Sequence, residues 1–195
     1  ADVTVSWTDG TGTKNTNQQT LEANRVSVID LGSVPKSATG LTISATEPVT
    51  AAAKVTNDGD GDQADFALVN ASVPMNVSAI AVPDHATAQV SVTNTSDDDR
   101  TATLTSYNGD GDIVEQSDLT IRAGASTTIE LADINDGDVA AVSLADPDQS
   151  MVWNIRVSQK DVSDAKLAGV SIIGATDLKE AREQVWSNQN MTIVR

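Results

Sequence analysis

The sequence contains no cysteine, and only one of its 195 residues is a histidine. The absence of cysteine excludes disulfides, thiolate-bound structural zinc and thiol catalysis. A serine triad would need the single histidine, His85, as its base, yet no G-x-S-x-G nucleophile elbow accompanies it. We therefore expect His85 to be an exposed loop residue, and we expect no catalytic residues and no enzymatic activity.

Aromatic residues make up only 3% of the chain, although hydrophobic residues together make up 39%. A hydrophobic core must therefore be built mainly from Val, Ile, Leu and Ala. The shortage of rings also disfavours a sugar-processing cleft, in which paired carboxylates work beside aromatic platforms. No apolar run approaches the roughly 20 residues of a transmembrane helix, so we expect no direct membrane insertion.

Basic residues are scarce as well. The chain has 12 Lys and Arg against 28 Asp and Glu, which gives a formal net charge of −16. A surface of this sign repels phosphate backbones, because contacts to phosphate require Lys and Arg. We therefore expect no nucleic-acid partner.

What the chain does contain is an internal repeat. The stretch "TLEANRVSVIDL" (20–31) resembles "TIRAGASTTIEL" (120–131), with Thr, Ala, Ile and Leu at the same places. Upstream, Trp7 aligns with Tyr107, and we expect each ring to cap its unit with the polar atom at the surface. Downstream, "VTAAAKVT" (49–56) aligns with "MVWNIRVS" (151–158), and "QVSVTN" (89–94) aligns with "NMTIVR" (190–195). The common order predicts a tandem duplication.

Each unit is a series of short segments in which apolar and polar residues alternate, separated by Gly, Asp, Asn and Pro. In the second unit the pattern predicts strands over 88–94, 101–107, 113–121, 126–131, 139–145 and 151–158. Gly124 in "AGAS" can take the positive φ of a tight turn. The fold class predicted is all-β, with two tandem immunoglobulin-like β-sandwich units.

The domain boundaries follow from the repeat. We expect a first unit over 1–87 and a second over 88–186, which ends in a short helix over 176–186, "TDLKEAREQVW". Strands 88–94 and 101–107 should form a hairpin, because the loop between them is short. Residues 187–195 should complete the first unit, with 190–195 pairing beside 2–7.

An acidic stretch, "DGDGDQAD" (58–65), is the one candidate metal site. Its acidic residues are Asp58, Asp60, Asp62 and Asp65. Alternating aspartates begin an EF-hand calcium loop, but Gln63 stands where that loop needs Gly, and its twelfth position is Val69 instead of Glu. Turn chemistry between strands is the competing interpretation. We expect no cofactor, with calcium as the alternative.

Three stretches carry a family resemblance: "RAGASTTIEL" (122–131), "EPVTAAAKV" (47–55) and "GATDLKEAREQVWSNQNMTIVR" (174–195). They resemble an actinobacterial family of secreted or envelope-associated β-sandwich repeat proteins of unknown function. The resemblance implies an exported envelope module and carries over no catalytic residue. The chain opens directly on the strand-like "ADVTVSW" without a signal peptide, which indicates a piece of a longer precursor.

The resulting hypothesis is a non-enzymatic extracellular or cell-envelope module with a structural or interaction role. Its partner would be an unidentified protein or envelope component. The alternative is a module that binds a carbohydrate or another small ligand, with calcium as a requirement for binding.

Overall fold

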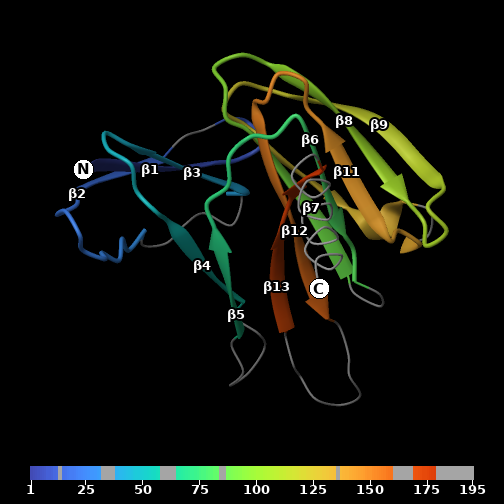
Figure 1. The fold of residues 1–195 in the computed structure, drawn as a ribbon, viewed down its shortest axis with the longest axis horizontal. Coiled ribbons are helices and arrows are strands. Elements are labelled where there is room, and N and C mark those ends of the chain that lie inside the picture. Colours follow the sequence, from blue (N-terminus) through green and yellow to red (C-terminus); the bar gives the residue numbers. More distant parts are fainter. Residues whose placement is uncertain are drawn as a thin grey trace, which may run out of the picture.

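The structure is a computed structural model that describes residues 1–12, 15–31, 38–57, 65–83, 87–134, 137–159 and 169–178. Over these residues the chain is all-β, as predicted, with one 3-10 turn, η1 (Leu131–Asp133). All strand pairs are antiparallel, and the strands form four sheets (Figure 1).

Two of these sheets make a sandwich in the second half of the chain. The larger has the order β14-β6-β11-β8-β9, and the smaller has the order β10-β7-β12-β13. The strands of the larger sheet are β6 (Val77–Ala81), β8 (Arg100–Tyr107), β9 (Ile113–Ile121), β11 (Ala141–Ala145) and β14 (Thr176–Asp177). Those of the smaller sheet are β7 (Thr87–Asn94), β10 (Ser126–Glu130), β12 (Met151–Gln159) and β13 (Gly169–Gly174).

The core lies between these two sheets. Alternate residues of β7 and β12, such as Val90 and Ile155, pack against Leu104 and Leu144 of the facing sheet, and all four side chains are buried. A period of two places every second side chain on the inner face, which is how a sandwich fills its core. The strands predicted over 88–158 therefore appear close to their predicted places, and Gly124 has the expected positive φ of 63°.

The first part of the chain is more open. One sheet has the order β2-β1-β3, built from β1 (Asp2–Thr8), β2 (Asn15–Thr20) and β3 (Gly40–Ala45). A separate hairpin pairs β4 (Ala52–Asn57) with β5 (Asp65–Asn70), and β5 lies beside β13 of the sandwich (Figure 1). We call residues 1–76, which carry these two elements, the first unit.

The first unit meets the sandwich through a buried group of hydroxyls. Ser126 Oγ lies 2.9 Å from Thr8 Oγ1 and 2.9 Å from Thr93 Oγ1, and all three residues are buried. The Ser126 N–H also donates to Asp9 O at 3.2 Å. Gly40 covers the three hydroxyls so closely that a Cβ there would stand 2.1 Å from Ser126 Oγ. The two parts therefore contact each other directly.

The strand arrangement agrees with the sequence repeat only in part. The order β2-β1-β3 corresponds to β9-β8-β11, and the pair Trp7↔Leu41 corresponds to Tyr107↔Ala141. The buried faces do not correspond, because β1 buries Val3, whereas Thr103 of β8 is half-buried. Residues 21–31 also contain no strand to match β10. The tandem duplication therefore stays a prediction.

Two predicted strand pairings are wrong. β7 and β8 lie in different sheets, so the loop between them crosses the sandwich and does not close a hairpin. β1 lies between β2 and β3, so neither of its edges can accept residues 190–195. Residues 187–195 themselves lie outside the described part of the chain.

Two segments near the predicted domain boundaries also belong to other elements than expected. Residues 77–81, expected in the first unit, form β6 and pair with β11 of the sandwich. The start of the helix expected over 176–186 is wrong, since Thr176 and Asp177 extend the sheet as β14 beside β6. Backbone pairing at the sheet edge overrides the local capping pattern there. Leu178 is helical, and residues 179–186 lie outside the described residues.

Candidate functional site

The residues of the predicted metal site can be placed only in part. Asp58, Asp60 and Asp62 lie outside the described residues, and so does His85. Asp65 is the first residue of β5, although its side chain is not described. Over the described ranges, no three His, Cys, Asp or Glu side chains gather closely enough to hold a metal ion.

A second acidic stretch, "NGDGD" (108–112), shows what such residues do in this protein. Asn108 Oδ1 accepts the N–H of Asp110 at 3.1 Å and the N–H of Asp112 at 2.9 Å. The asparagine side chain thereby closes the turn between β8 and β9, and Gly111 takes a positive φ of 86°. This stretch serves as a turn.

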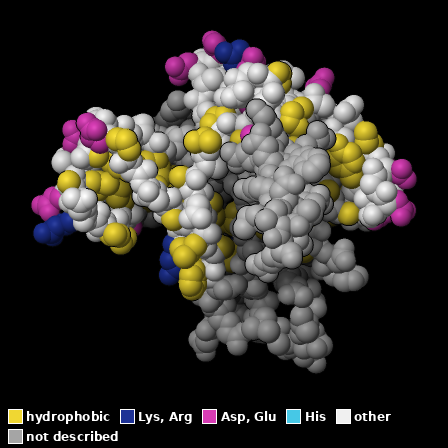
Figure 2. Space-filling model, in the orientation of Figure 1, with side chains coloured by type: hydrophobic (Ala, Val, Ile, Leu, Met, Phe, Trp, Pro, Cys, Tyr) yellow, Lys and Arg dark blue, Asp and Glu magenta, His cyan; other side chains and the backbone are white. Residues whose placement is uncertain are grey.

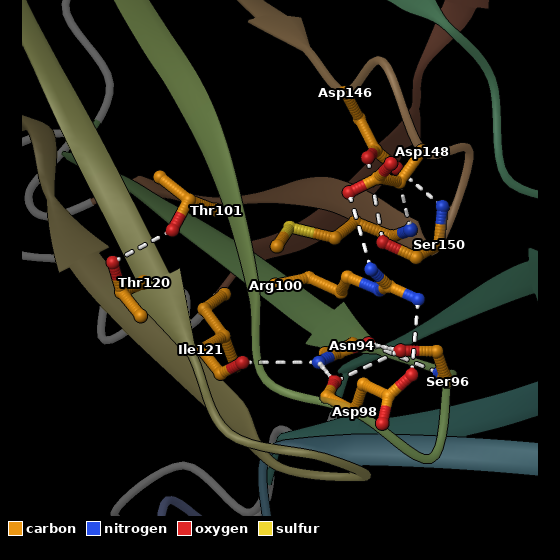
Figure 3. Close-up of polar contacts among 11 residues, drawn as sticks. Asn94, Ser96, Asp98, Arg100, Thr101, Thr120, Ile121, Asp146, Asp148 and Ser150 are labelled. Atoms are coloured by element: carbon orange, nitrogen blue, oxygen red, sulfur yellow. Dashed lines mark hydrogen bonds and ion pairs between the residues drawn. The ribbon is translucent and has the colours of Figure 1, made fainter.

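A polar cluster lies at one end of the sandwich, where three loops meet (Figure 3). Its centre is Asp146, which is fully buried. Asp146 Oδ2 accepts the N–H of Ser150 at 2.6 Å and the N–H of Met151 at 2.7 Å. The carboxylate is thus used to hold the β11–β12 loop, because buried N–H groups need acceptors.

The other members of the cluster also bond to backbone. Asn94, likewise fully buried, donates from Nδ2 to Ile121 O at 3.0 Å and to Asp98 O at 2.8 Å. These bonds hold the loop that carries the chain from β7 in one sheet to β8 in the other. Arg100 lies between Asp98 and Asp148, at 3.1 and 3.5 Å (Figure 3). The cluster therefore ties three loops together, and Ser150 is too buried to act as an exposed nucleophile.

Among the described residues, the aromatic side chains give no stacking platform for a sugar ring. Trp153 is buried and donates from Nε1 to Ser78 Oγ at 2.7 Å. Tyr107 OH lies 3.2 Å from Ser143 Oγ. The Nε1 atom of Trp7 is buried and has no hydrogen-bond partner among the described residues, so the expectation that its polar atom reaches the surface is wrong. Lys54 Nζ stands over the ring of Phe66, 4.6 Å from its centroid.

Exposed large apolar side chains, by contrast, are more numerous in the first unit than in the rest of the described chain. Most of the exposed large hydrophobic residues of the described chain fall within the first unit: Val26, Val28, Ile43, Val49, Phe66, Leu68 and Val73. In Figure 2 hydrophobic side chains lie at the surface of the left-hand lobe and of the segment below it, where Figure 1 places β1–β3 and β4–β5. We call these seven residues the apolar surface.

The sequence of β5 carries a signal for this surface, which the predicted strands did not include. In β5, Phe66 and Leu68 alternate with Ala67 and Val69, so both faces of the strand are apolar. A two-stranded hairpin has only one face to bury. Ala67 is buried, whereas Phe66 and Leu68 are 53% and 65% exposed.

Comparison with known proteins identifies the family. The chain belongs to a family of unknown function, DUF5719, which matches residues 1–132. The matched region includes the first unit together with β6–β10. No curated protein and no solved structure shows significant similarity to the chain. Among the described elements, no helix has the length and apolar character needed to cross a membrane.

Proposed function

We propose that this protein is a non-enzymatic module of the cell exterior or cell envelope that binds another envelope component through its first unit. The observation that carries the proposal is the apolar surface. Soluble proteins rarely expose large apolar areas together, and such areas mark sites of interaction. The sandwich, whose own core is continuous and buried, serves as the base that holds this surface.

The chemistry of the rest of the described chain supports a binding role. The polar cluster around Asp146 holds loops in place, and the buried Trp153 forms a hydrogen bond between the two sheets. The composition is compatible with a place outside the cytoplasm, because a chain with no cysteine has no thiol to oxidise there, and a net charge of −16 favours solubility.

The hairpin face offers the most direct test. Phe66 and Leu68 can both be changed to Ser in one variant, and its retention on isolated cell-envelope fragments can be measured by co-sedimentation. We expect the variant to lose at least about tenfold in affinity, since removing two apolar side chains from an interface costs about 1.4 kcal/mol or more. The melting temperature should stay nearly unchanged, because both side chains are exposed.

A matched control is Ile113→Ser, which removes a 59% exposed hydrophobic residue from β9, outside the first unit. This variant should bind envelope fragments like the unaltered protein. Equal retention of the double variant and the control would contradict the proposal. Turnover of any substrate in a panel of hydrolase assays would contradict the non-enzymatic assignment.

A further inference from the structure

The edge of β3 differs from every other sheet edge in the described chain. Edge strands present unpaired N–H and C=O groups, and proteins protect them with charged residues, proline, bulges or covering segments. β9 carries Glu115 and Asp118, β10 carries Glu130, β14 carries Asp177, and β4 carries Lys54. β13 lies beside β5. Each of these edges is therefore charged or covered.

β2, the opposite edge of the same sheet, is protected differently. Its sequence, "NTNQQT", is wholly polar, and its two asparagines have low strand propensity. Asn17 also donates from Nδ2 to Asp30 O at 3.5 Å, so the segment after β2 lies against this edge. β3, "GLTISA", has neither a charge nor a proline, and Ile43, Ser44 and Ala45 are exposed.

The direction of the backbone groups of β3 follows from the pairing. The N–H of Thr46 donates to Asp2 O at 3.1 Å, and bonded pairs alternate along an antiparallel ladder. Ser44 and Thr42 therefore point their backbone groups toward β1. Leu41, Ile43 and Ala45 point theirs outward, where no described segment pairs with them.

The sandwich shows what kind of strand suits such a position. β11, which corresponds to β3 in strand order, has its outer edge covered by β6 in antiparallel pairing. The sequence of β6, "VSAIA", is uncharged and combines one Ile with small and β-branched residues. β3 is likewise uncharged and combines Ile and Leu with small residues and one β-branched Thr, so β3 itself can serve as a partner strand.

We propose that the β3 edge binds the β3 edge of a second copy of this protein, in antiparallel pairing about a two-fold axis at Ile43. This pairing rests on the proposed function, because it names a second copy of the protein as one partner of the first unit. The two three-stranded sheets then join into one continuous sheet. A symmetric contact of this kind is self-complementary and closes as a dimer.

The register places compatible side chains opposite each other. Ile43 faces the partner's Ile43, and Leu41 faces the partner's Ala45, while the hydroxyls of Thr42 and Ser44 lie across from one another. Cross-strand pairs of these types stabilise sheets. Glu47, the nearest acidic residue after β3, falls opposite the partner's Thr39 and meets no other carboxylate. The uncharged edge thus gives two chains of net charge −16 a place to meet.

The absence of cysteine makes a direct test possible. In the full chain, Ile43→Cys places two thiols opposite each other, with Cα atoms about 5.5 Å apart in a bonded antiparallel pair, which a short bifunctional thiol crosslinker can bridge. With such a crosslinker we expect this variant to form a covalent dimer, seen by denaturing electrophoresis. Ile113→Cys, on the exposed face of β9, should remain mostly monomeric.

Sedimentation velocity without crosslinking provides the second measurement. The unaltered protein should show a concentration-dependent dimer that strengthens with added salt, because salt screens the repulsion between two acidic chains. Ile43→Lys should weaken the dimer at least about tenfold, whereas Ile113→Lys should not. Thermal melts followed by circular dichroism serve as the control that both variants are folded.

Other results would overturn the inference. A protein that stays monomeric at every concentration and salt level, with no crosslink at position 43, has no such dimer. Binding of a synthetic peptide with the sequence of residues 76–83 to that monomer would instead identify a foreign strand as the occupant. In either case the loss of envelope binding in the Phe66 and Leu68 variant would be unaffected, so the two proposals can fail separately.

Discussion

The indole N–H of Trp153 donates to Ser78 Oγ across the sandwich, at 2.7 Å, and both side chains are buried. Trp153 belongs to β12 of one sheet and Ser78 to β6 of the other. The bond therefore links the two sheets directly. It also fixes β6, the strand that follows the first unit, to the sandwich.

This pair should be energetically coupled. Trp153→Phe keeps most of the buried ring but leaves Ser78 Oγ without its donor, so we expect a loss of about 1–3 kcal/mol in the free energy of unfolding. Ser78→Ala should cost a similar amount because it leaves the buried indole N–H unpaired. In a double-mutant cycle the two changes should show a coupling of about 1 kcal/mol, measured by urea unfolding. Additive effects would show that the bond contributes nothing.

Gly40 should be essential for the contact between the first unit and the sandwich. A Cβ at this position would lie 2.1 Å from Ser126 Oγ and 2.6 Å from Thr93 Oγ1, so both of these side chains must be displaced. We expect Gly40→Ala to lower the free energy of unfolding by about 1–3 kcal/mol, measured by thermal or chemical denaturation. Gly109→Ala is the control, since a Cβ there meets nothing within 4 Å. A Gly40 variant as stable as the control would mean that the two parts do not pack as described.

Asp146 should matter far more than its neighbour Asp148. Asp146→Ala leaves the N–H groups of Ser150 and Met151 without their acceptor in a buried loop. We expect a loss of about 2–5 kcal/mol, seen as a lower urea midpoint. Asp148→Ala removes only the ion pair with Arg100, in which the Asp148 side chain is 50% exposed. Ion pairs as exposed as this contribute about 0–1 kcal/mol to the free energy of unfolding. Equal effects of the two substitutions would argue against the buried role of Asp146.

Calcium should not stabilise the protein. The acidic stretch "NGDGD" serves as a turn. For residues 58–65 only the sequence bears on the question, and its departures from a calcium loop at Gln63 and Val69 disfavour a calcium site. We expect millimolar calcium to leave the melting temperature unchanged within about 1 °C, as for a protein with no occupied site. A rise in melting temperature that disappears in an Asp60→Asn variant would instead establish the calcium site.

Much of the local structure could be predicted from the sequence. The strands over 88–158 follow from alternation of apolar and polar residues, which depends only on neighbours in the chain. Gly124 could be assigned to a tight turn because glycine takes positive φ without a steric penalty. The Asp and Gly clusters marked turns for the same kind of local reason.

The partners of those strands were decided by the tertiary structure. A short loop after β7 is compatible with a hairpin or with a crossing between sheets, and the buried side-chain bonds of Asn94 hold the crossing. The central place of β1 and the pairing of Thr176 with β6 likewise arise from contacts between distant segments. Alternation places Phe66 and Leu68 on one face of β5 but cannot say whether another layer covers that face. Exposure is a property of the whole fold, so the candidate interaction surface and the open β3 edge became visible only when the strands were placed in space.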